Sequence, residues 1–462
     1  MRPAVAGANV ELDQAAPEET RRKSRFRCSC MPNISALWVD LQANADEVPI
    51  AVAISSQFSP EYDQFIPDTR RAWLRLAVAV VIGSLGSVGM WSVVVALPVV
   101  QTDFGATRGT ASLAFTMVML GFGLGQVVTG KISDRYGIVA AIGAGIGILG
   151  LGYIGAGYAP SIWAFNLLHF AIGLSSAATF GPLMAEASHW FERYRGLAVA
   201  IAASGNYIGG TIWPPLANFG MQTYGWRTTH IAIGIFTAVA MTLALLVLRL
   251  LMGAAVRRSH VNAQAPRIDL RLSTNALTAI LALASISCCV AMSMPQVHIV
   301  AYCGDLGYGV ARGAEMLSLM LGFGIISRIG SGFLADRIGG IRTLLIGSIA
   351  QGAALLFYLF FDSLTSLYVI SAMFGLFQGG IVPSYAIIVR EAMPASQAAT
   401  RIGIVIFASV FGMSFGGWIS GVIFDATGSY AAAFANGLAW NLLNVSIVLL
   451  LMMRARQRLA LA

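Results

Sequence analysis

One arginine lies in the middle of a long apolar segment. Arg328 is surrounded by apolar and small residues within the run from 311 to 334. A charge at mid-membrane depth costs about 2.5–3.5 kcal/mol on insertion scales, so such residues usually face a water-filled cavity. The guanidinium is a planar fork that matches a carboxylate. Arg328 therefore predicts a carboxylate-binding site; the alternative is an arginine that snorkels to lipid or bonds a carbonyl.

A charged turn follows this arginine directly and occurs twice. The pattern G-x-x-x-D-R-x-G appears as GKISDRYG and as GFLADRIG. The first copy holds Gly130, Asp134, Arg135 and Gly137, and the second, 202 positions later, holds Gly332, Asp336, Arg337 and Gly339. This repeat predicts two related halves. The same offset carries Arg328 onto Gln126, so we expect an anion between the halves to contact both side chains.

The composition requires a lipid environment for the elements that position these residues. The chain has 462 residues, of which 57% are hydrophobic and only 11% charged, whereas a soluble domain carries about 25% charged residues. The net charge of +8 is spread over short loops, which favours a membrane topology signal over nucleic-acid binding. Walker, HExxH and dinucleotide fingerprints are missing, and the five cysteines have no metal or disulfide spacing. We expect no enzyme activity, cofactor or metal.

The fold class predicted is an all-α membrane protein with twelve transmembrane helices in two pseudo-symmetric six-helix halves. A spanning helix needs about 20 apolar residues, and twelve segments meet this length: 73–100, 108–131, 138–158, 161–187, 196–220, 227–252, 275–302, 311–334, 340–361, 364–389, 400–424 and 428–452. The domains expected are a disordered cytoplasmic tail (1–71), a first half (72–252), a cytoplasmic central loop (253–274), a second half (275–453) and a cytoplasmic tail (454–462).

The orientation follows from the distribution of arginine and lysine. Apart from the tail at 1–71, fourteen of these residues fall on one side of the predicted bundle, Lys131 and Arg337 among them. The other side has only Arg108, Arg227 and Arg312. Cytoplasmic loops carry the excess of positive charge. Both termini and the central loop are therefore expected in the cytoplasm, in a bacterial inner membrane.

Twelve spans, a basic central loop and two such turns resemble the major facilitator superfamily. The resemblance covers residues 73–452, and in that family the turn joins helices 2–3 and 8–9. It implies that Asp134 and Arg135, with the glycines of both turns and Asp336 and Arg337, are gating residues. The family's Asp meets a helix N-terminus in the opposite half, where a carboxylate is favoured. The alternative is a turn that only caps helices and sets topology.

A narrower likeness lies at the fifth span. The run WFERYRGLAVAIAASG (190–205) is similar to the signature of the monocarboxylate porters, and bacterial oxalate/formate-type exchangers are similar too. The second signature of that group reads DTRRAW here, with Asp68, Ala72 and Trp73 in place. The resemblance implies that Arg328 binds the substrate carboxylate. The family's Asp one turn earlier, its suspected proton carrier, is Gly324 in this chain.

Other polar residues complete the predicted site. If protons are coupled, His298, His169 and Glu186 are the candidates, since histidine titrates near physiological pH; each histidine could instead be a packed hydrogen-bonding residue. Helices 1, 5 and 10 line the central cavity of the resembled fold. Their polar and aromatic residues could contact substrate or could be packing: Trp91, Asn206, Tyr207, Gln378 and Tyr385.

These observations predict a secondary transporter of a small organic anion, monocarboxylate-like, working by alternating access. The coupling partner is left open between protons and a counter-anion. Two alternatives remain: a non-transporting membrane sensor on the same fold, and an exporter of neutral small molecules.

Overall fold

The structure is a computed structural model that describes residues 68–191, 193–252, 268 and 270–459. Over these residues all regular structure is helical. The helices of the first half are α3 (Arg70–Gly86), α4 (Val88–Phe104), α5 (Arg108–Tyr136), α6 (Ile138–Gly157), α7 (Ile162–Ser176), α8 (Gly181–Trp190), α9 (Arg195–Tyr224) and α10 (Trp226–Leu251). Those of the second are α11 (Thr274–Asp305), α12 (Val310–Ile338), α13 (Gly340–Phe360), α14 (Leu364–Gln378), α15 (Ile381–Ala392), α16 (Ala395–Thr427) and α17 (Tyr430–Leu459).

These helices confirm the predicted all-α membrane fold. Eleven spans in the described part of the chain are long and apolar enough to cross a bilayer, with α3–α4, α7–α8 and α14–α15 each forming one span. The twelfth is α9, which has 30 residues but falls outside this group. Its glycines, two prolines and several polar side chains make it more polar than its neighbours. We attribute this to its position, because α9 lies against α12 rather than against lipid alone.

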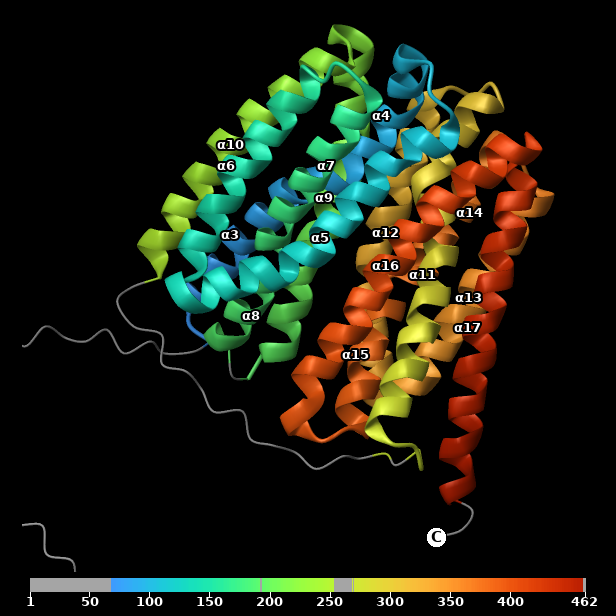
Figure 1. Cartoon of the computed structure of the whole chain (residues 1–462). Helices are drawn as coiled ribbons and strands as arrows, with labels where there is room; N and C mark the ends of the chain where they lie inside the picture. Colours follow the sequence, from blue (N-terminus) through green and yellow to red (C-terminus); the bar gives the residue numbers. More distant parts are fainter. Residues whose placement is uncertain (1–67, 192, 253–267, 269, 460–462) are drawn as a thin grey trace, which may run out of the picture. The chain divides into compact units, whose positions relative to one another are not determined.

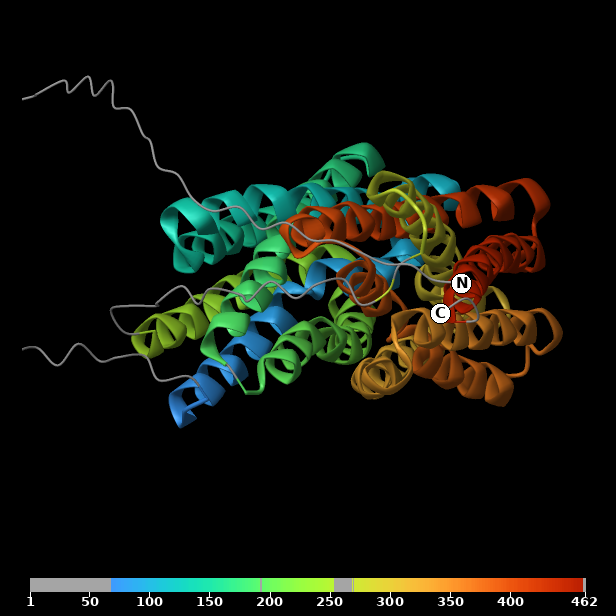
Figure 2. The same cartoon turned by 90° about the horizontal axis from the view of Figure 1, so that it is seen from below.

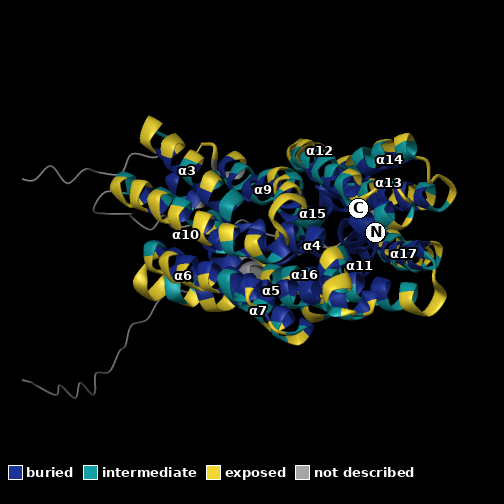
Figure 3. Ribbon diagram, turned by 90° about the horizontal axis from the view of Figure 1, so that it is seen from above, coloured by how far each residue is buried: buried dark blue, intermediate teal, exposed yellow. Residues whose placement is uncertain are grey.

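Residues 1–67 of the predicted tail lie outside the described residues. The helices that follow in the chain form two groups that lie side by side. Helices α3–α10 form one group and α11–α17 the other (Figures 1 and 2). The most extensive contacts across the seam between them are those of α5 with α16 and of α9 with α12, and α4 also contacts α11 and α12. Buried residues concentrate along this seam, whereas exposed residues lie on the outer faces (Figure 3). The outer faces carry large apolar side chains, such as Leu250 and Leu151, which suits contact with lipid.

The internal repeat extends from the sequence to the packing. Helix α7 ends at Ser176 and α14 at Gln378, again 202 positions apart. A Cβ at Gly173 would lie 2.0 Å from the carbonyl oxygen of Val118, and one at Gly375 would lie 2.0 Å from that of Met320. Both glycines and both carbonyls are related by the same offset. Each half therefore uses an equivalent glycine to let two helix backbones approach closely.

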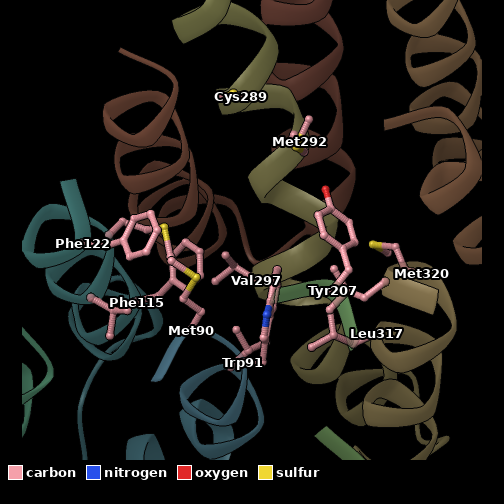
Figure 4. Packing of buried hydrophobic residues seen from close by; sticks show 14 of the residues in the cluster. Met90, Trp91, Phe115, Phe122, Tyr207, Cys289, Met292, Val297, Leu317 and Met320 are labelled. Atoms are coloured by element: carbon pink, nitrogen blue, oxygen red, sulfur yellow. The ribbon is translucent and has the colours of Figure 1, made fainter. Parts of the chain in front are cut away.

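An apolar cluster fills the seam. Met90 and Trp91 of α4, Phe115 and Phe122 of α5 and Tyr207 of α9 come from the first half (Figure 4). They meet Met292 and Val297 of α11 and Leu317 and Met320 of α12 from the second half (Figure 4). Every side chain in this cluster is at most 9% exposed. The cluster brings the two halves together next to the predicted substrate site.

Candidate functional site

Arg328 lies on α12 at the seam between the halves. Its guanidinium carbon lies 4.5 Å from the ring centre of Tyr207, which belongs to α9 in the opposite half. Its Nη1 donates to the carbonyl of Ala203 over 3.2 Å, and its Nε lies 3.5 Å from the carbonyl of Gly379. No carboxylate pairs with it among the residues that the structure describes. The side chain is half-buried and touches both halves while keeping its charge uncompensated.

Gly324 makes room for the ring beneath this arginine. A Cβ at Gly324 would lie 2.4 Å from Cε1 of Tyr207, closer than real contacts allow. The same stretch of α12 also packs against the break between α14 and α15, since a Cβ at Gly379 would lie 2.3 Å from the carbonyl oxygen of Gly324. The position where the resembled family has an Asp is thus occupied here by an aromatic ring from the other half.

Trp91 and Asn206 lie beside this ring and are bonded to each other. The indole nitrogen of Trp91 donates to the side-chain oxygen of Asn206 over 3.1 Å and to its carbonyl over 3.2 Å. The Asn206 amide also points at the sulfur of Met90. This fixes the orientation of Trp91 in the apolar cluster. Both residues lie near Tyr207, and their contact with substrate stays a prediction.

The other predicted substrate contacts are placed differently from one another. Gln378 is buried at the end of α14 and accepts a hydrogen bond of 2.9 Å from Gln296 of α11. The oxygen of Gln126 faces α8 at Gly181, and its amide nitrogen has no partner in the described residues. Tyr385 is fully buried and donates to Asn444 of α17 over 2.7 Å. That bond directs Tyr385 toward a helix of its own half, so packing is a sufficient explanation for it.

The candidate proton carriers occupy two kinds of environment. His169 and His298 are both buried, and each has one ring nitrogen bonded to a backbone carbonyl at 2.8 Å, that of Phe165 or that of Gly417. His169 lies inside an aromatic cage in the first half, whereas His298 reaches α16 from α11. Glu186 is half-buried on α8 and makes no hydrogen bond or ion pair with described residues. Their role in coupling stays a prediction.

The two repeated turns lie at one end of the bundle, here named the motif end. Gly137 and Gly339 end α5 and α12 with φ of 85° and 83°, a conformation that favours glycine. Asp134, Arg135, Asp336 and Arg337 are exposed, and Gly130 and Gly332 have open space around them. Neither aspartate makes an ion pair with described residues. The turn geometry suits the predicted motif, while its gating role stays a prediction.

At the opposite end, here named the far end, the halves are locked together by charged groups. The carboxylate of Asp425 in α16 accepts from the first two backbone N–H groups of α5, at 2.9 and 2.7 Å. The side chain of Arg108 pairs with Asp305 at 3.1 Å, donates to Tyr430 and covers the ring of Phe424. We name Arg108, Asp305, Asp425 and Tyr430 the far-end latch. From the sequence, Arg108 was expected only as a topology signal.

The seam loosens toward the motif end. Among the glycines of α5, Gly123 is close to the opposite half, since a Cβ there would touch Val410 and Phe407 of α16. One turn further on, Val127 is 57% exposed, and Gly130 and Gly403 have no neighbours within 4 Å. The structure is therefore closed at the far end and separated along α5 and α16 at the motif end. Between α9 and α12 it keeps a largely apolar groove of 340 Å³, lined by Thr211, Pro215, Gly322 and Ile326 among others.

The two runs that resemble the monocarboxylate porter signatures, DTRRAW (68–73) and the run at 190–205, contact each other at the motif end. The carboxylate of Asp68 accepts from the backbone N–H of Arg193 over 3.0 Å, and its own N–H donates to the carbonyl of Trp190. The ring of Trp73 packs on Phe191 and Tyr194, with ring centres 4.9 and 6.0 Å apart. The residues before the first span thus hold the loop that begins the fifth, which gives both signatures a shared structural role.

Comparison with protein families gives one match across nearly the whole described chain. The model of the Major Facilitator Superfamily matches residues 79–369 and 316–460. Among curated proteins, Monocarboxylate transporter 13 of Bos taurus is 26% identical over 316 residues, covering 67% of this chain and 72% of that protein. Agnestins efflux protein AgnL12 of Paecilomyces divaricatus is 26% identical over 337 residues, covering 70% of this chain and 73% of that protein.

Solved structures show a similar fold at low sequence identity. The nucleoside transporter NupG superposes with a TM-score of 0.64 at 12% identity, covering 83% of this chain and 99% of that one. A bacterial homologue of the human lysosomal transporter Spinster, in an inward-facing and unoccupied conformation, has a TM-score of 0.60 at 16% identity. It covers 84% of this chain and 96% of that one. At these identities the likeness concerns the fold alone.

Proposed function

Because the chain belongs to the major facilitator superfamily, we propose that it is a secondary transporter of small organic anions, monocarboxylates above all. The observation that carries this proposal is the environment of Arg328. Its guanidinium lies at the seam, is held by an aromatic face and two carbonyls, and has no carboxylate partner among the described residues. A half-buried cation without a counter-charge favours an anionic ligand. The monocarboxylate transporters among the relatives support the same class of substrate.

The contacts of Arg328 also connect substrate binding to the relative movement of the two halves. It belongs to α12 in the second half, yet its contacts with Tyr207 and Ala203 are in the first. An anion that replaces the Ala203 carbonyl would take two guanidinium bonds in place of one weak contact. Binding would thus change the contacts across the seam, which is what alternating access requires.

The far-end latch supports a carrier in one of its two open states. The halves are bonded at the far end and separated along α5 and α16 at the motif end. With the motif end in the cytoplasm, as the arginine distribution favours, this state is open inward. In the second state the turn aspartates Asp134 and Asp336 would close the motif end, and the latch would part. We assign the protein to a cytoplasmic membrane on the same topology argument.

Two mechanisms are considered for driving transport: symport of the anion with a proton, and exchange of the anion for a counter-anion. With Gly324 in the place of the family's Asp, a proton would have to be carried by Glu186, His298 or His169. Glu186 is the most accessible of the three, being half-buried and without a hydrogen-bond or ion-pair partner in the described residues. An imposed pH gradient distinguishes the mechanisms, since it drives uptake in proton symport and leaves anion exchange unchanged.

A second candidate function is efflux of a small organic product. The relative named as an efflux protein, with identity equal to that of the monocarboxylate transporters, favours it. Counterflow in vesicles of both orientations would separate export from uptake.

The test of the main proposal is uptake into proteoliposomes of the full chain. Radiolabelled monocarboxylates of two to five carbons should accumulate with the wild-type protein, and Arg328→Gln should abolish this accumulation. Normal transport by Arg328→Gln would remove the binding role. Accumulation of neutral compounds only would contradict an anionic substrate.

A further inference from the structure

Two buried glutamines in the second half form a bonded pair in which two of the four side-chain polar atoms have no partner among the described residues. Nε2 of Gln296 in α11 donates to Oε1 of Gln378 in α14 over 2.9 Å. Each side chain is only 1% exposed. The oxygen of Gln296 and the nitrogen of Gln378 are buried without a partner among the described residues. Buried polar groups are normally hydrogen-bonded, so two unpaired atoms in one pair point to a missing partner.

The pair keeps one free nitrogen and one free oxygen whichever way the two side-chain amides are oriented. Oxygen and nitrogen of a glutamine side chain are assigned from the hydrogen-bond network. If both amides were turned over, Gln378 would donate to Gln296, and the free atoms would be the nitrogen of Gln296 and the oxygen of Gln378. In either arrangement the pair has one nitrogen free to donate and one oxygen free to accept.

The pair lies beside the arginine of the proposed site. Gln378 is the last residue of α14, and the carbonyl of the next residue, Gly379, lies 3.5 Å from Nε of Arg328. Gln296 follows Met292 by four residues, which places both on the same face of α11. Met292 belongs to the apolar cluster in the seam (Figure 4). The glutamine pair and Arg328 therefore border the same break between α14 and α15.

We infer that Gln296 and Gln378 recognise a neutral group of the transported anion that both donates and accepts a hydrogen bond, a hydroxyl or a carboxamide. This inference rests on the proposed function, in which Arg328 holds the carboxylate. A hydroxyl supplies both functions from one oxygen, and a carboxamide supplies them from two atoms. A second ionised carboxylate can only accept and an ammonium can only donate, so each would leave one amide atom unsatisfied. An unsubstituted alkyl chain would leave both unsatisfied, and a site with buried polar groups rejects such ligands.

The state seen here covers both amides. At 1% exposure they are not open to solvent, so the anion reaches them as the helices around the α14–α15 break separate. Gly379 and Gly380 connect the two helices at this break, and α12 packs directly on both. The two glutamines therefore contact the anion while the protein changes from one open state to the other. They select among anions that Arg328 alone would bind.

The experiment measures binding by thermal shift of the purified full-length protein. The probes are butanoate, its 2-, 3- and 4-hydroxy derivatives, and 4-amino-4-oxobutanoate. At least one hydroxy acid or the amide should bind roughly tenfold more tightly than butanoate, which corresponds to about 1.4 kcal/mol. Gln296→Leu and Gln378→Leu should each bring this ratio to within about twofold of one, while butanoate binding persists. The hydroxyl and amide probes distinguish the two chemistries.

Gln351 provides the matched control. It is a fully buried glutamine of the same half, on α13, and both ends of its amide are used. Its nitrogen donates to the carbonyl of Cys288 over 3.3 Å, and its oxygen accepts from the Cys288 thiol over 3.7 Å. Gln351→Leu should keep the tenfold ratio. If a leucine variant at the pair does not fold, Gln296→Asn and Gln378→Asn, which keep an amide but shorten its reach, should lower the ratio.

Two results would overturn the inference. A wild-type ratio of one for every probe would mean that the free amide atoms take no part in recognition. A ratio that survives in both leucine variants would place selectivity elsewhere. Failure of the proposed function itself has a different signature: Arg328→Lys would then bind every anion, butanoate included, as the wild type does. If Arg328→Lys weakens all anions and the glutamine variants change no ratio, only the present inference fails.

Discussion

Truncating Arg108 should open the far end. Its side chain is 9% exposed, but the side chain of its partner Asp305 is 41% exposed, so their ion pair is worth at most about 0.5 kcal/mol after solvent screening. The hydrogen bond to Tyr430 adds about 1 kcal/mol, and the contact with the Phe424 ring at 4.9 Å about 0.5 kcal/mol. The two bonds to Asp425 come from the backbone and survive in Arg108→Ala. The expected loss is therefore about 2 kcal/mol, a roughly 30-fold shift away from the far-end-closed state.

Spin labels at the motif end can measure this shift. Lys131 on α5 and Arg342 on α13 are exposed and belong to different halves. Cysteines introduced at these positions, in a chain with Cys28 and Cys30 changed to serine, allow distance measurement by double electron–electron resonance. Opening of the far end should bring the motif ends together. Arg108→Ala should therefore give a population of shorter distances that is minor or undetected without the substitution.

The matched control is Arg227 in the same end of the first half. It pairs with Asp103 at 3.0 Å and stacks over Trp226 at 4.3 Å, all within one half. Arg227→Ala removes a similar set of interactions without crossing the seam, and should leave the distances unchanged. Equal shifts in both variants, or no shift in Arg108→Ala, would refute the assignment of the latch.

Three further predictions follow from the site. Gly324→Asp should destabilise the protein by about 1–3 kcal/mol, read as a lower Tm, because its Cβ would collide with the Tyr207 ring, and Tyr207→Ala should restore part of the loss. His169→Phe should leave the pH profile of uptake unchanged, since the ring is bonded to the carbonyl of Phe165 inside an aromatic cage; a displaced profile would make His169 a proton carrier. Asp134→Asn should slow turnover with little change in anion affinity, and a weakened affinity alone would remove its gating role.

The repeat could be found in the sequence because the same residue types recur at a fixed offset of 202 positions. Asp134 and Asp336 end two long helices at matching places, and the glycines after them adopt the positive φ that their type allows. The offset even predicts equivalent packing, as Gly173 and Gly375 demonstrate. Such features depend on local geometry and chain spacing, which a sequence carries directly.

Contacts across the seam could not be predicted in this way. In lipid, apolar residues occur on every face of a helix, so periodicity gives little information about which face meets another helix. Tyr207 was expected near substrate, but nothing in the sequence places its ring against Gly324. Gln296 follows Pro295 in an apolar run and became notable only through its bond to Gln378.

Helix membership also proved too coarse for assigning cavity residues. Tyr385 was selected because its helix lines the cavity of the resembled fold, yet its hydroxyl bonds Asn444 of α17. The rotation of α15 about its axis decides this, and it is set by packing with three or more neighbouring helices. Arg108 was missed for the related reason that its partners Asp305 and Asp425 lie about 200 and 317 residues further along the chain.

The affinity of the protein for a monocarboxylate, measured with and without the Arg328 guanidinium, tests directly whether this arginine binds the transported anion. Binding of butanoate should weaken about ten- to a hundredfold in Arg328→Lys, which keeps the charge but loses the fork. Arg401→Lys is the control, because Arg401 of α16 bonds only Gln397 of its own helix among the described residues. Wild-type affinity in Arg328→Lys and in Arg328→Gln would show that this arginine does not bind the transported anion.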